Sequence, residues 1–571
     1  MDKRPVSKEQ GKLLDLQEAV SRYVKPGMKL HLAGGIGGPS AAVCEIIRQY
    51  QGRNPDFTLI QSTVTGHALN LVHTKLVSKL VCSVCANIAA SGRPSRVIQA
   101  ALERGLLTIE NWTLNSLQQR LMAGASGVPF MPTRSVTGSS IAAENEEAFK
   151  TVDDPFGSGE RIGLVAALVP DISIIHGCVA DADGNTILCA PCGEDLWGAL
   201  ASRGGAVVTV ENVVSTDFIK RYAALVKIPS YAVNAVVLAP LGLHPYSLAN
   251  PGVCDLEPYE KDIDFLSDLY DASGSDEALN RWINEWIGGC RSHHDYLDRL
   301  GRERISGLIK KASVAAGESS RPSPPDMPGK QDVQPREMML IALSREIVKS
   351  VKSRGHKLVL AGAGAAATAA FHAYYSSDPP AFELATGNGQ IGYNPVPGEP
   401  ILASEAGVRR SKILTDTVMM LGVFVGGTHN RCLSVVGAGQ IDKYANINST
   451  RTSEGKFLVG SGGANDALNA SEAIVCLDQS NRRFVERLCY ITGRGSPVTT
   501  VVSTMGIFRK PNPHDELHLV ACFPNSHVRS LEDRVKEIRN NCGWDLKTAP
   551  VVEEVPGPST EELQLLRWLT R

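Results

Sequence analysis

The chain has 571 residues, enough for two or more domains, and its 43% hydrophobic and 21% charged composition is that of an ordinary globular protein. A formal net charge of −2 leaves no basic surplus for binding nucleic acid or an anionic membrane. The N-terminal segment is charged and lacks the apolar centre of a signal peptide, and no run approaches the ~18 apolar residues of a membrane span. We therefore expect a cytoplasmic protein whose thirteen scattered cysteines are reduced thiols.

The chain repeats its opening pattern. Residues 29–38 (KLHLAGGIGG) match residues 357–366 (KLVLAGAGAA) at an offset of 328. In both places a helix-like segment, a Gly turn and a short apolar strand lead into a stretch of Gly and Ala. An amphipathic helix follows, over residues 41–50 in the first copy and from residue 369 in the second. Strands that alternate with helices in this way predict a parallel sheet covered on both faces.

A second matching pair lies deeper in the chain. The segments IIHGCVADADGNTIL and SVVGAGQIDKYANINST each run from an apolar strand into Gly, then Asp, then Asn four residues later. The paired residues are Asp181 with Asn185 and Asp442 with Asn446. Because both matching pairs occur in the same order, the sequence predicts two related α/β units.

A linker separates the two units. Residues 316–336 (AGESSRPSPPDMPGKQDVQPR) are rich in Pro, Ser, Gly and charge, and they keep no apolar period. The sequence therefore predicts a first domain over residues 1–315 and a second domain over residues 337–571.

Four glycine-rich stretches follow predicted strands, at residues 33–39, 361–366, 437–442 and 460–466. Exposed N–H groups in such turns bind anions or developing oxyanions, because no side chain blocks the approach. None of the four continues into the Gly-Lys-Ser/Thr of a phosphate-binding loop. The last, GSGGAND, is typical of a loop pressed against a ligand or of a packed helix N-terminus.

Two Cys-x-x-Cys pairs, Cys82/Cys85 and Cys189/Cys192, superficially resemble a zinc site. Both lie in or directly after strand-like segments, where buried thiols are the simpler interpretation. We therefore predict no metal.

On these motifs the chain resembles the family I CoA-transferases of the glutaconate CoA-transferase branch, with the two usual subunits fused. The first half resembles the A-type subunit through GGIGGPSAAVCEIIRQ, VPFMPTRS and APLGLHP, and the second resembles the B-type subunit through GAGQIDKYANINST, GSGGAND and TEELQLLRWL. The resemblance implies two open α/β domains of the NagB/RpiA/CoA-transferase type, joined by the Pro-rich linker. It also implies a homo-oligomer of the fused A/B unit and no permanently bound cofactor, with coenzyme A entering as part of the substrate.

The family binds acyl-CoA at the junction of its two domains. A glutamate of the B-type domain attacks the thioester, and CoA then passes through a glutamyl-CoA to an acceptor carboxylate. The resemblance implies that the Gly-rich stretches of both halves contact the substrate, at Gly34, Gly35, Gly37, Gly38, Asn388, Gly437, Gly439, Gln440, Gly462, Gly463, Ala464 and Asn465.

The position of the family glutamate holds no carboxylate in this chain. Alignment on FELATGNGQIGYNP places Gly387 there, and an ungapped count places Thr386 there. Glu405, in LASEAGVRR, resembles the Ser-Glu-Asn-Gly turn of other members and is the alternative nucleophile. It lies 32 residues before Gly437, whereas Gly387 lies 50 before it and better matches the family spacing. Glu383 is interpreted as an ordinary charge on a strand.

Divergent members of the family that lack this glutamate decarboxylate or hydrolyse their acyl-CoA instead. Such chemistry needs an acid or base, and Glu110 is our candidate, because LLTIENWTLNSL is typical of a strand ending beside a helix start. A carboxylate at the carboxyl end of a strand faces the ligand crevice of open α/β sheets, although it can also be a solvated charge. Three hypotheses remain open. The first is C–C hydrolysis or decarboxylation of a carboxylic or dicarboxylic acyl-CoA with Glu110, and the second is CoA transfer to a carboxylate with Glu405 or another glutamate. The third is a catalytically silent CoA-binding or assembly protein.

Overall fold

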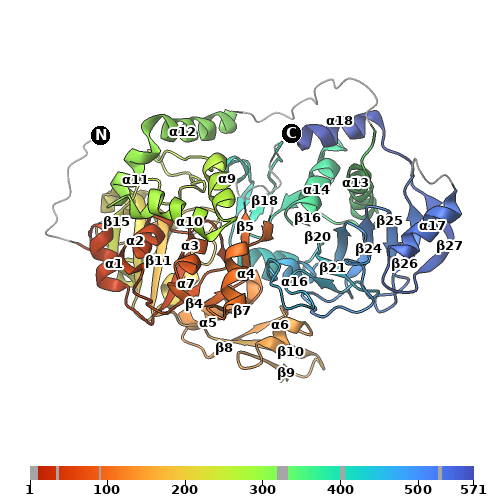
Figure 1. Ribbon diagram of the computed structural model, residues 1–571, viewed down its shortest axis with the longest axis horizontal. Coiled ribbons are helices and arrows are strands. Elements are labelled where there is room, and N and C mark those ends of the chain that lie inside the picture. The colour runs from red at the N-terminus through yellow and green to blue at the C-terminus, as the bar shows by residue number, and fades with distance from the viewer. Residues whose placement is uncertain are drawn as a thin grey trace.

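The computed structural model describes residues 11–33, 38–88, 92–317, 332–395, 397–398, 405–524 and 530–570. Figure 1 shows two α/β units side by side, each built around its own twisted sheet. We call residues 11–317 the A half and residues 332–570 the B half.

The A half is built on a nine-stranded sheet whose central strands are parallel. Strand β11 is buried at every position, as expected of a parallel strand covered on both faces. The parallel strands, in spatial order, are β7 (Thr108–Asn111), β4 (Val77–Cys82), β2 (Phe57–Ile60), β1 (Lys29–Ala33), β11 (Ile172–Asp181), β13 (Ala206–Val214) and β15 (Val233–Leu238). Two antiparallel strands, β12 (Thr186–Leu188) and β14 (Val226–Ile228), continue from β11.

Helices cover both faces of the A-half sheet: two layers of helices lie on one face, and α5 (Leu114–Ala125) and α7 (Asp195–Ala201) pack on the other. Helix α2 is buried along nearly its whole length, because Phe265, Trp282 and Tyr296 of the outer helices join the same core. The outer helices are α9 (Ile263–Ala272), α10 (Asp276–Ile283), α11 (His293–Leu300) and α12 (Arg302–Gly317). The others are α1 (Leu16–Tyr23), α2 (Ser40–Tyr50), α3 (His67–His73), α4 (Arg96–Glu103), α5 (Leu114–Ala125), α6 (Ser140–Glu144), α7 (Asp195–Ala201) and α8 (Thr216–Arg221).

Two small sheets complete the A half. The antiparallel sheet β8 (Phe130–Thr133), β10 (Arg161–Ala166) and β9 (Phe149–Asp153) projects below the junction of the halves in Figure 1. The second contains β3 (Thr63–Val64), β5 (Val84–Ile88) and β6 (Gly92–Pro94) and lies beside the junction.

The B half is built on a ten-stranded sheet with a parallel centre. Its strands in spatial order are β19 (Ile413–Leu414), β18 (Gln390–Ile391), β17 (Glu383–Ala385), β16 (Leu358–Ala361), β20 (Cys432–Gly437), β23 (Glu472–Leu477), β24 (Val498–Ser503), β25 (Gly506–Arg509), β26 (His518–Cys522) and β27 (Lys547–Glu554). A separate pair is formed by β21 (Gln440–Ile441) and β22 (Ile447–Asn448). Its helical elements are α13 (Pro335–Arg354), α14 (Ala365–Tyr375), α15 (Glu405–Arg409), η4 (Val418–Val425), α16 (Ala464–Ala467), α17 (Leu531–Asn540) and α18 (Thr560–Leu569).

The two sheets share one topology. The order β2-β1-β11-β13-β15 in the A half corresponds to β17-β16-β20-β23-β24 in the B half. The matching Asp residues also make the same turn: Asp181 accepts the Asn185 N–H at 2.9 Å, and Asp442 accepts the Asn446 N–H at 3.0 Å. The predicted pair of related α/β units is therefore confirmed.

One detail of the sequence match is wrong. Helices α2 and α14 both have 11 residues, but α14 begins at Ala365, before the predicted start at Ala369. Three residues separate the end of β16 from the start of α14, whereas six separate the end of β1 from the start of α2. The constant offset therefore fails beyond the strands, because a loop changes length more readily than a packed strand.

The predicted linker, residues 316–336, overlaps the end of α12 and the start of α13, and its centre lies outside the described residues. The boundaries at residues 315 and 337 stay a prediction. Among the helices that the structure describes, none is long and apolar enough to cross a membrane.

Candidate active site

The GSGGAND loop of the B half hydrogen-bonds to residues at or just after the ends of two A-half strands. The Gly462 N–H donates to the Ser83 carbonyl at 3.1 Å, and the Gly462 carbonyl accepts the Leu114 N–H at 3.0 Å. The Ser461 N–H donates to the Asn111 side chain at 3.1 Å. These contacts hold the carboxyl ends of the two sheets toward each other, which is where open α/β sheets bind ligands.

Asp466 and Asn465, at the end of the loop, also hydrogen-bond to the A half. The Asp466 carboxylate, fully buried, accepts the Asn115 N–H at 3.0 Å and the Ser135 hydroxyl at 2.7 Å. The Asn465 side-chain oxygen accepts the Val136 N–H at 2.8 Å. Burial raises the pKa of Asp466 to about 6, against the opposing effect of these donors. Asn465, predicted to contact substrate, therefore joins the halves and is not among the described residues that line the cavity.

A cavity of about 510 Å³ lies at this junction, and its walls are mostly apolar. The A-half wall includes Ser62, Thr63, Val84, Gln118 and Glu194. The B-half wall is built from small residues of the Gly-rich turns: Gly362, Ala363, Thr386, Gly387, Asn388, Gly437, Ala438, Gly439, Gly462, Gly463 and Ala464. Seven predicted contact or site residues thus meet here: Gly387, Asn388, Gly437, Gly439, Gly462, Gly463 and Ala464.

Gly38 and Gln440, also predicted to contact substrate, are not among the described residues that line the cavity. Gly34, Gly35 and Gly37 fall outside the described residues. Gly38 has a left-handed φ of +67° and packs against Gln61, where an added Cβ would lie 2.7 Å from the side-chain nitrogen. Gln440 donates to the Arg482 carbonyl and accepts from Asn448, so both ends of its amide serve the turn.

Gly387, the position aligned with the family glutamate, lies on the cavity wall. A Cβ added there would have the Leu421 methyl groups as its nearest neighbours, at 3.8 and 3.9 Å, so a side chain has room. Glu383 lies on β17, is about 40% exposed and pairs with Lys412. Glu405 begins α15, but its side chain lies outside the described part. The B-half wall that the structure describes therefore presents no carboxylate.

Glu194 is the one carboxyl group among the described lining residues. It precedes α7, and both of its oxygens accept the Ser62 main-chain N–H, at 2.7 and 2.8 Å. Burial, opposed by this bond and reinforced by Asp195, raises the pKa of Glu194 to about 8. The group is therefore mainly a neutral acid at pH 7. The sequence analysis missed it, because an acidic residue before a helix is normally a helix N-terminal charge.

Glu110 lies near the end of β7, as predicted, but is held by three partners. Its carboxylate contacts Arg120 at 2.6 Å, Trp112 Nε1 at 2.8 Å and Lys79 at 2.7 Å. Burial alone would raise the pKa of Glu110, but these partners lower it to about 2. Glu110 is not among the described lining residues, although the adjacent Asn111 contacts the GSGGAND loop.

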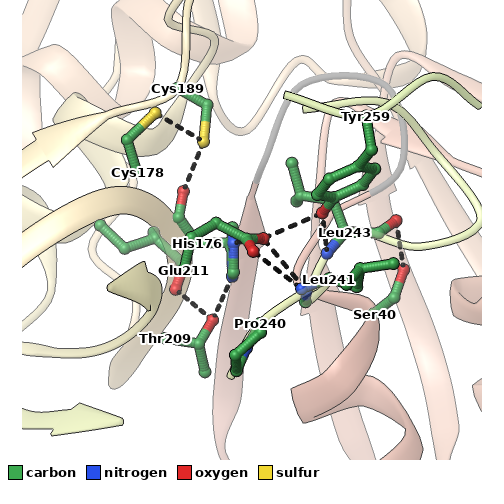
Figure 2. Close-up of polar contacts among 12 residues, drawn as sticks. Ser40, His176, Cys178, Cys189, Thr209, Glu211, Pro240, Leu241, Leu243 and Tyr259 are labelled. Atoms are coloured by element: carbon green, nitrogen blue, oxygen red, sulfur yellow. Dashed lines mark hydrogen bonds and ion pairs between the residues drawn. The ribbon is translucent and has the colours of Figure 1, made fainter. Parts of the chain in front are cut away.

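A second buried polar cluster, shown in Figure 2, lies within the A half. His176 on β11 contacts Glu211 on β13 at 2.9 Å, and Glu211 accepts the Leu241 N–H at 2.8 Å. The neighbouring Gly242 carbonyl accepts the Ala41 N–H at 3.0 Å, at the start of α2. The APLGLHP turn is thereby fixed beneath α2. In the described part of the chain, no group of three or more His, Cys, Asp or Glu residues is placed to hold a metal ion.

Comparisons with known proteins agree with this arrangement. The family model "Coenzyme A transferase" matches residues 13–239. Glutaconate CoA-transferase of Acidaminococcus fermentans matches through both of its chains. Its A-type chain is 29% identical over 52% of this protein and 94% of its own length, and its B-type chain is 32% identical over 24% and 56%. The A-type chain of the Pseudomonas knackmussii 3-oxoadipate CoA-transferase is 31% identical over 50% of this protein and 98% of its own length.

Solved structures also align with both halves of the chain. The acyl-CoA transferase YdiF of Escherichia coli O157:H7 aligns with 97% of this chain and 97% of its own, with a TM-score of 0.65 and 16% identity, and it supports the fold. The A-type and B-type relatives match distinct halves of the chain. The chain belongs to the CoA-transferase family, as an enzyme whose A-type and B-type subunits are fused.

Proposed function

We propose that this enzyme decarboxylates a dicarboxylic acyl-CoA and forms no glutamyl-CoA intermediate. The observation that carries the proposal is the location of the carboxyl group: the A-half wall of the cavity has one, and the described B-half wall has none. Gly387 stands where the family glutamate aligns, and the neutral acid Glu194 lines the A-half wall.

The proposed step needs a proton donor and no nucleophile. The C–C bond to the free carboxylate breaks and CO2 leaves. In a glutaconyl-type acyl group, the double bond then carries the bonding electron pair into the thioester to form a dienolate. Glu194 then donates its proton to the enolate carbon and regains a proton from water. A pKa of about 8 keeps Glu194 protonated at pH 7, as this role requires.

The cavity walls favour the same step. No described lining residue is Lys, Arg or His, so a bound carboxylate finds no cation and is destabilised relative to neutral CO2. Ala363, Gly387 and Ala438 line the cavity, and their main-chain N–H groups make no hydrogen bond within the described residues. They are suitable donors for the enolate oxygen.

Hydrolysis of a C–C bond would instead need a base to activate water. Glu194 is protonated at neutral pH, and Glu110 is bound by three partners away from the described cavity wall. The predicted acid/base role of Glu110 stays a prediction, and the geometry favours Glu194.

The test is incubation with glutaconyl-CoA and related dicarboxylic acyl-CoAs in D2O. We expect release of CO2, one deuterium in the shortened acyl chain by mass spectrometry, and no CoA attached to the protein. Turnover that releases no CO2 and passes CoA to an added carboxylate would overturn the proposal.

CoA transfer between carboxylates is the second candidate, favoured by the names of the relatives. It requires a glutamate nucleophile, at Glu405 or Glu194. A borohydride-sensitive CoA adduct, located by peptide mass spectrometry, would establish this candidate and identify the residue. We also propose a homo-oligomer of the fused unit, which light scattering would test.

A further inference from the structure

A second pocket, of about 510 Å³, lies in the B half between helix α13 and strands β24 and β25, which Figure 1 shows side by side. It shares no described lining residue with the cavity at the junction. Its wall includes Glu472 and Val498, the first residues of β23 and β24, whereas the cavity lies at the carboxyl ends of the same sheet. Because β23 has six residues and spans about 20 Å, the two spaces are separate.

The lining of this pocket is charged, whereas the described cavity wall has no cation. Its charged residues are four cations and two carboxylates, with a net charge of +2: Lys349, Arg354, Arg509, Lys510, Glu346 and Glu472. Both carboxylates already have partners, since Glu346 contacts Arg509 at 2.5 Å and Glu472 contacts an arginine of α13 at 3.2 Å. Lys510 donates to two main-chain carbonyls, and Lys349 makes no hydrogen bond or ion pair within the described residues. The pocket therefore presents unneutralised positive charge, which attracts an anion.

Three donors lie around one part of this pocket. Thr500 and Arg509 are direct partners in the β24–β25 ladder, so their side chains lie on the same face, with Cβ atoms about 5 Å apart. Lys349 follows Glu346 by three residues on α13 and is its neighbour on the helix surface, and Glu346 contacts the Arg509 guanidinium. The Thr500 hydroxyl has no hydrogen-bond partner within the described residues and is not among the unpaired polar atoms that are fully covered. A hydroxyl, an ammonium and a guanidinium are therefore within reach of one ligand group.

We propose that Lys349, Thr500 and Arg509 bind the phosphate group of a small organic phosphate ester. A phosphate accepts charge-assisted hydrogen bonds from Lys and Arg at once, and a further oxygen accepts from a hydroxyl. A pocket of about 510 Å³ has the size of a small-molecule site and exceeds what one phosphate fills, so room remains for the rest of the ester. Free inorganic phosphate is the other source of the same chemistry. The proposal does not rest on the proposed function, because it concerns a different pocket.

The test is calorimetric titration of the full chain with inorganic phosphate, glucose 6-phosphate and glucose, in the presence of saturating CoA. CoA occupies any phosphate-binding groups of the substrate site, so the titration reports the second pocket. We expect inorganic phosphate to bind with a dissociation constant of about 1 mM, glucose 6-phosphate about tenfold more tightly, and glucose not at all. Equal affinities for the two phosphates would overturn the ester and identify free phosphate as the ligand.

Lys349→Met should weaken phosphate binding about tenfold or more, the effect of one hydrogen bond from a charged group, and Thr500→Val about fivefold. Lys352→Met is the matched control. Lys352 lies on the same helix but is not among the described lining residues, so the affinity should stay within about twofold of wild type.

Absence of phosphate binding to the wild-type protein would overturn the proposal. Equal affinities in wild type, Lys349→Met and Thr500→Val would overturn it as well. If Thr500→Val fails to fold by circular dichroism, the variant at the exposed Lys349 decides.

Discussion

The two halves repeat one sheet but present different groups at the same place. Strand β2 ends at Ile60 and leads to Ser62, and strand β17 ends at Ala385 and leads to Gly387. Both following residues line the cavity. The Ser62 N–H binds the Glu194 carboxyl group, whereas the Gly387 N–H makes no hydrogen bond within the described residues.

The comparison shows how two halves with the same fold come to have different roles in the site. The backbone repeats, so each half brings N–H donors to the same edge of its sheet. The side chains differ between the halves, and the carboxyl group that lines the cavity, Glu194, belongs to the A half. Four experiments test this difference between the halves.

Replacing the acid should have the largest effect. Glu194→Gln retains the shape of the side chain but cannot donate a carboxylic proton, so CO2 release should fall about 100-fold or more. The measurement is the rate of CO2 formation at saturating acyl-CoA. The Glu45→Gln variant, altered on α2 away from the described cavity wall, is the control. A Glu194→Gln rate within a few-fold of wild type would remove the residue from the mechanism.

Restoring a carboxylate to the B half should change the reaction. Gly387→Glu has room beside Leu421 and would return a nucleophile to the cavity wall. We expect a CoA adduct on the peptide carrying residue 387, together with slower CO2 release. Gly387→Gln should give the slower release without the adduct. An adduct on another peptide would show that a different glutamate attacks the thioester.

The buried acid should also make stability depend on pH. The pKa of Glu194 is raised from 4.5 to about 8 by folding, so the unfolded chain loses this proton first and stability falls as pH rises between these values. The expected contribution is about 1.4 kcal/mol per pH unit. Urea unfolding at pH 5.5 and 7.5 should show a smaller fall in Glu194→Gln. Equal falls in both proteins would contradict the raised pKa.

Glu110 should show the smallest effect on activity. Glu110→Gln weakens the contacts to Arg120 and Lys79, and we expect a loss of about 1–3 kcal/mol in the free energy of unfolding. CO2 release should stay within about tenfold of wild type. A loss as large as that of Glu194→Gln, with a folded protein, would return Glu110 to the catalytic role that its strand position suggests.

Much of the fold could be predicted because short sequence patterns indicate its strands, turns and helices. The Gly-rich stretches after strands, the Asp-to-Asn spacing and the family motifs indicated two α/β units and a junction built from small residues. The match failed beyond β16, where a shorter loop moved the start of α14 to Ala365. It failed because residues in a loop are not constrained by the core that fixes the strands.

The site was predicted only in part. Glycines such as Gly437 and Gly462 were found because a wall pressed against a ligand needs residues without side chains, and that need shows in sequence. The sequence did not reveal that Glu194 lines the cavity as a neutral acid, or that Glu110 is held as a carboxylate by three partners. Each is one acid beside a helix start, and what separates them is distant in sequence: Arg120 and Lys79 for one, Ser62 and burial for the other.

The amino-acid sequence alone was enough to predict the family and the fused A-type and B-type units, because these depend on residue identity and local spacing. Only the tertiary structure decided which carboxyl group lines the cavity and whether that group is ionised. The reason is that a pKa is set by burial and by neighbours brought together from remote parts of the chain.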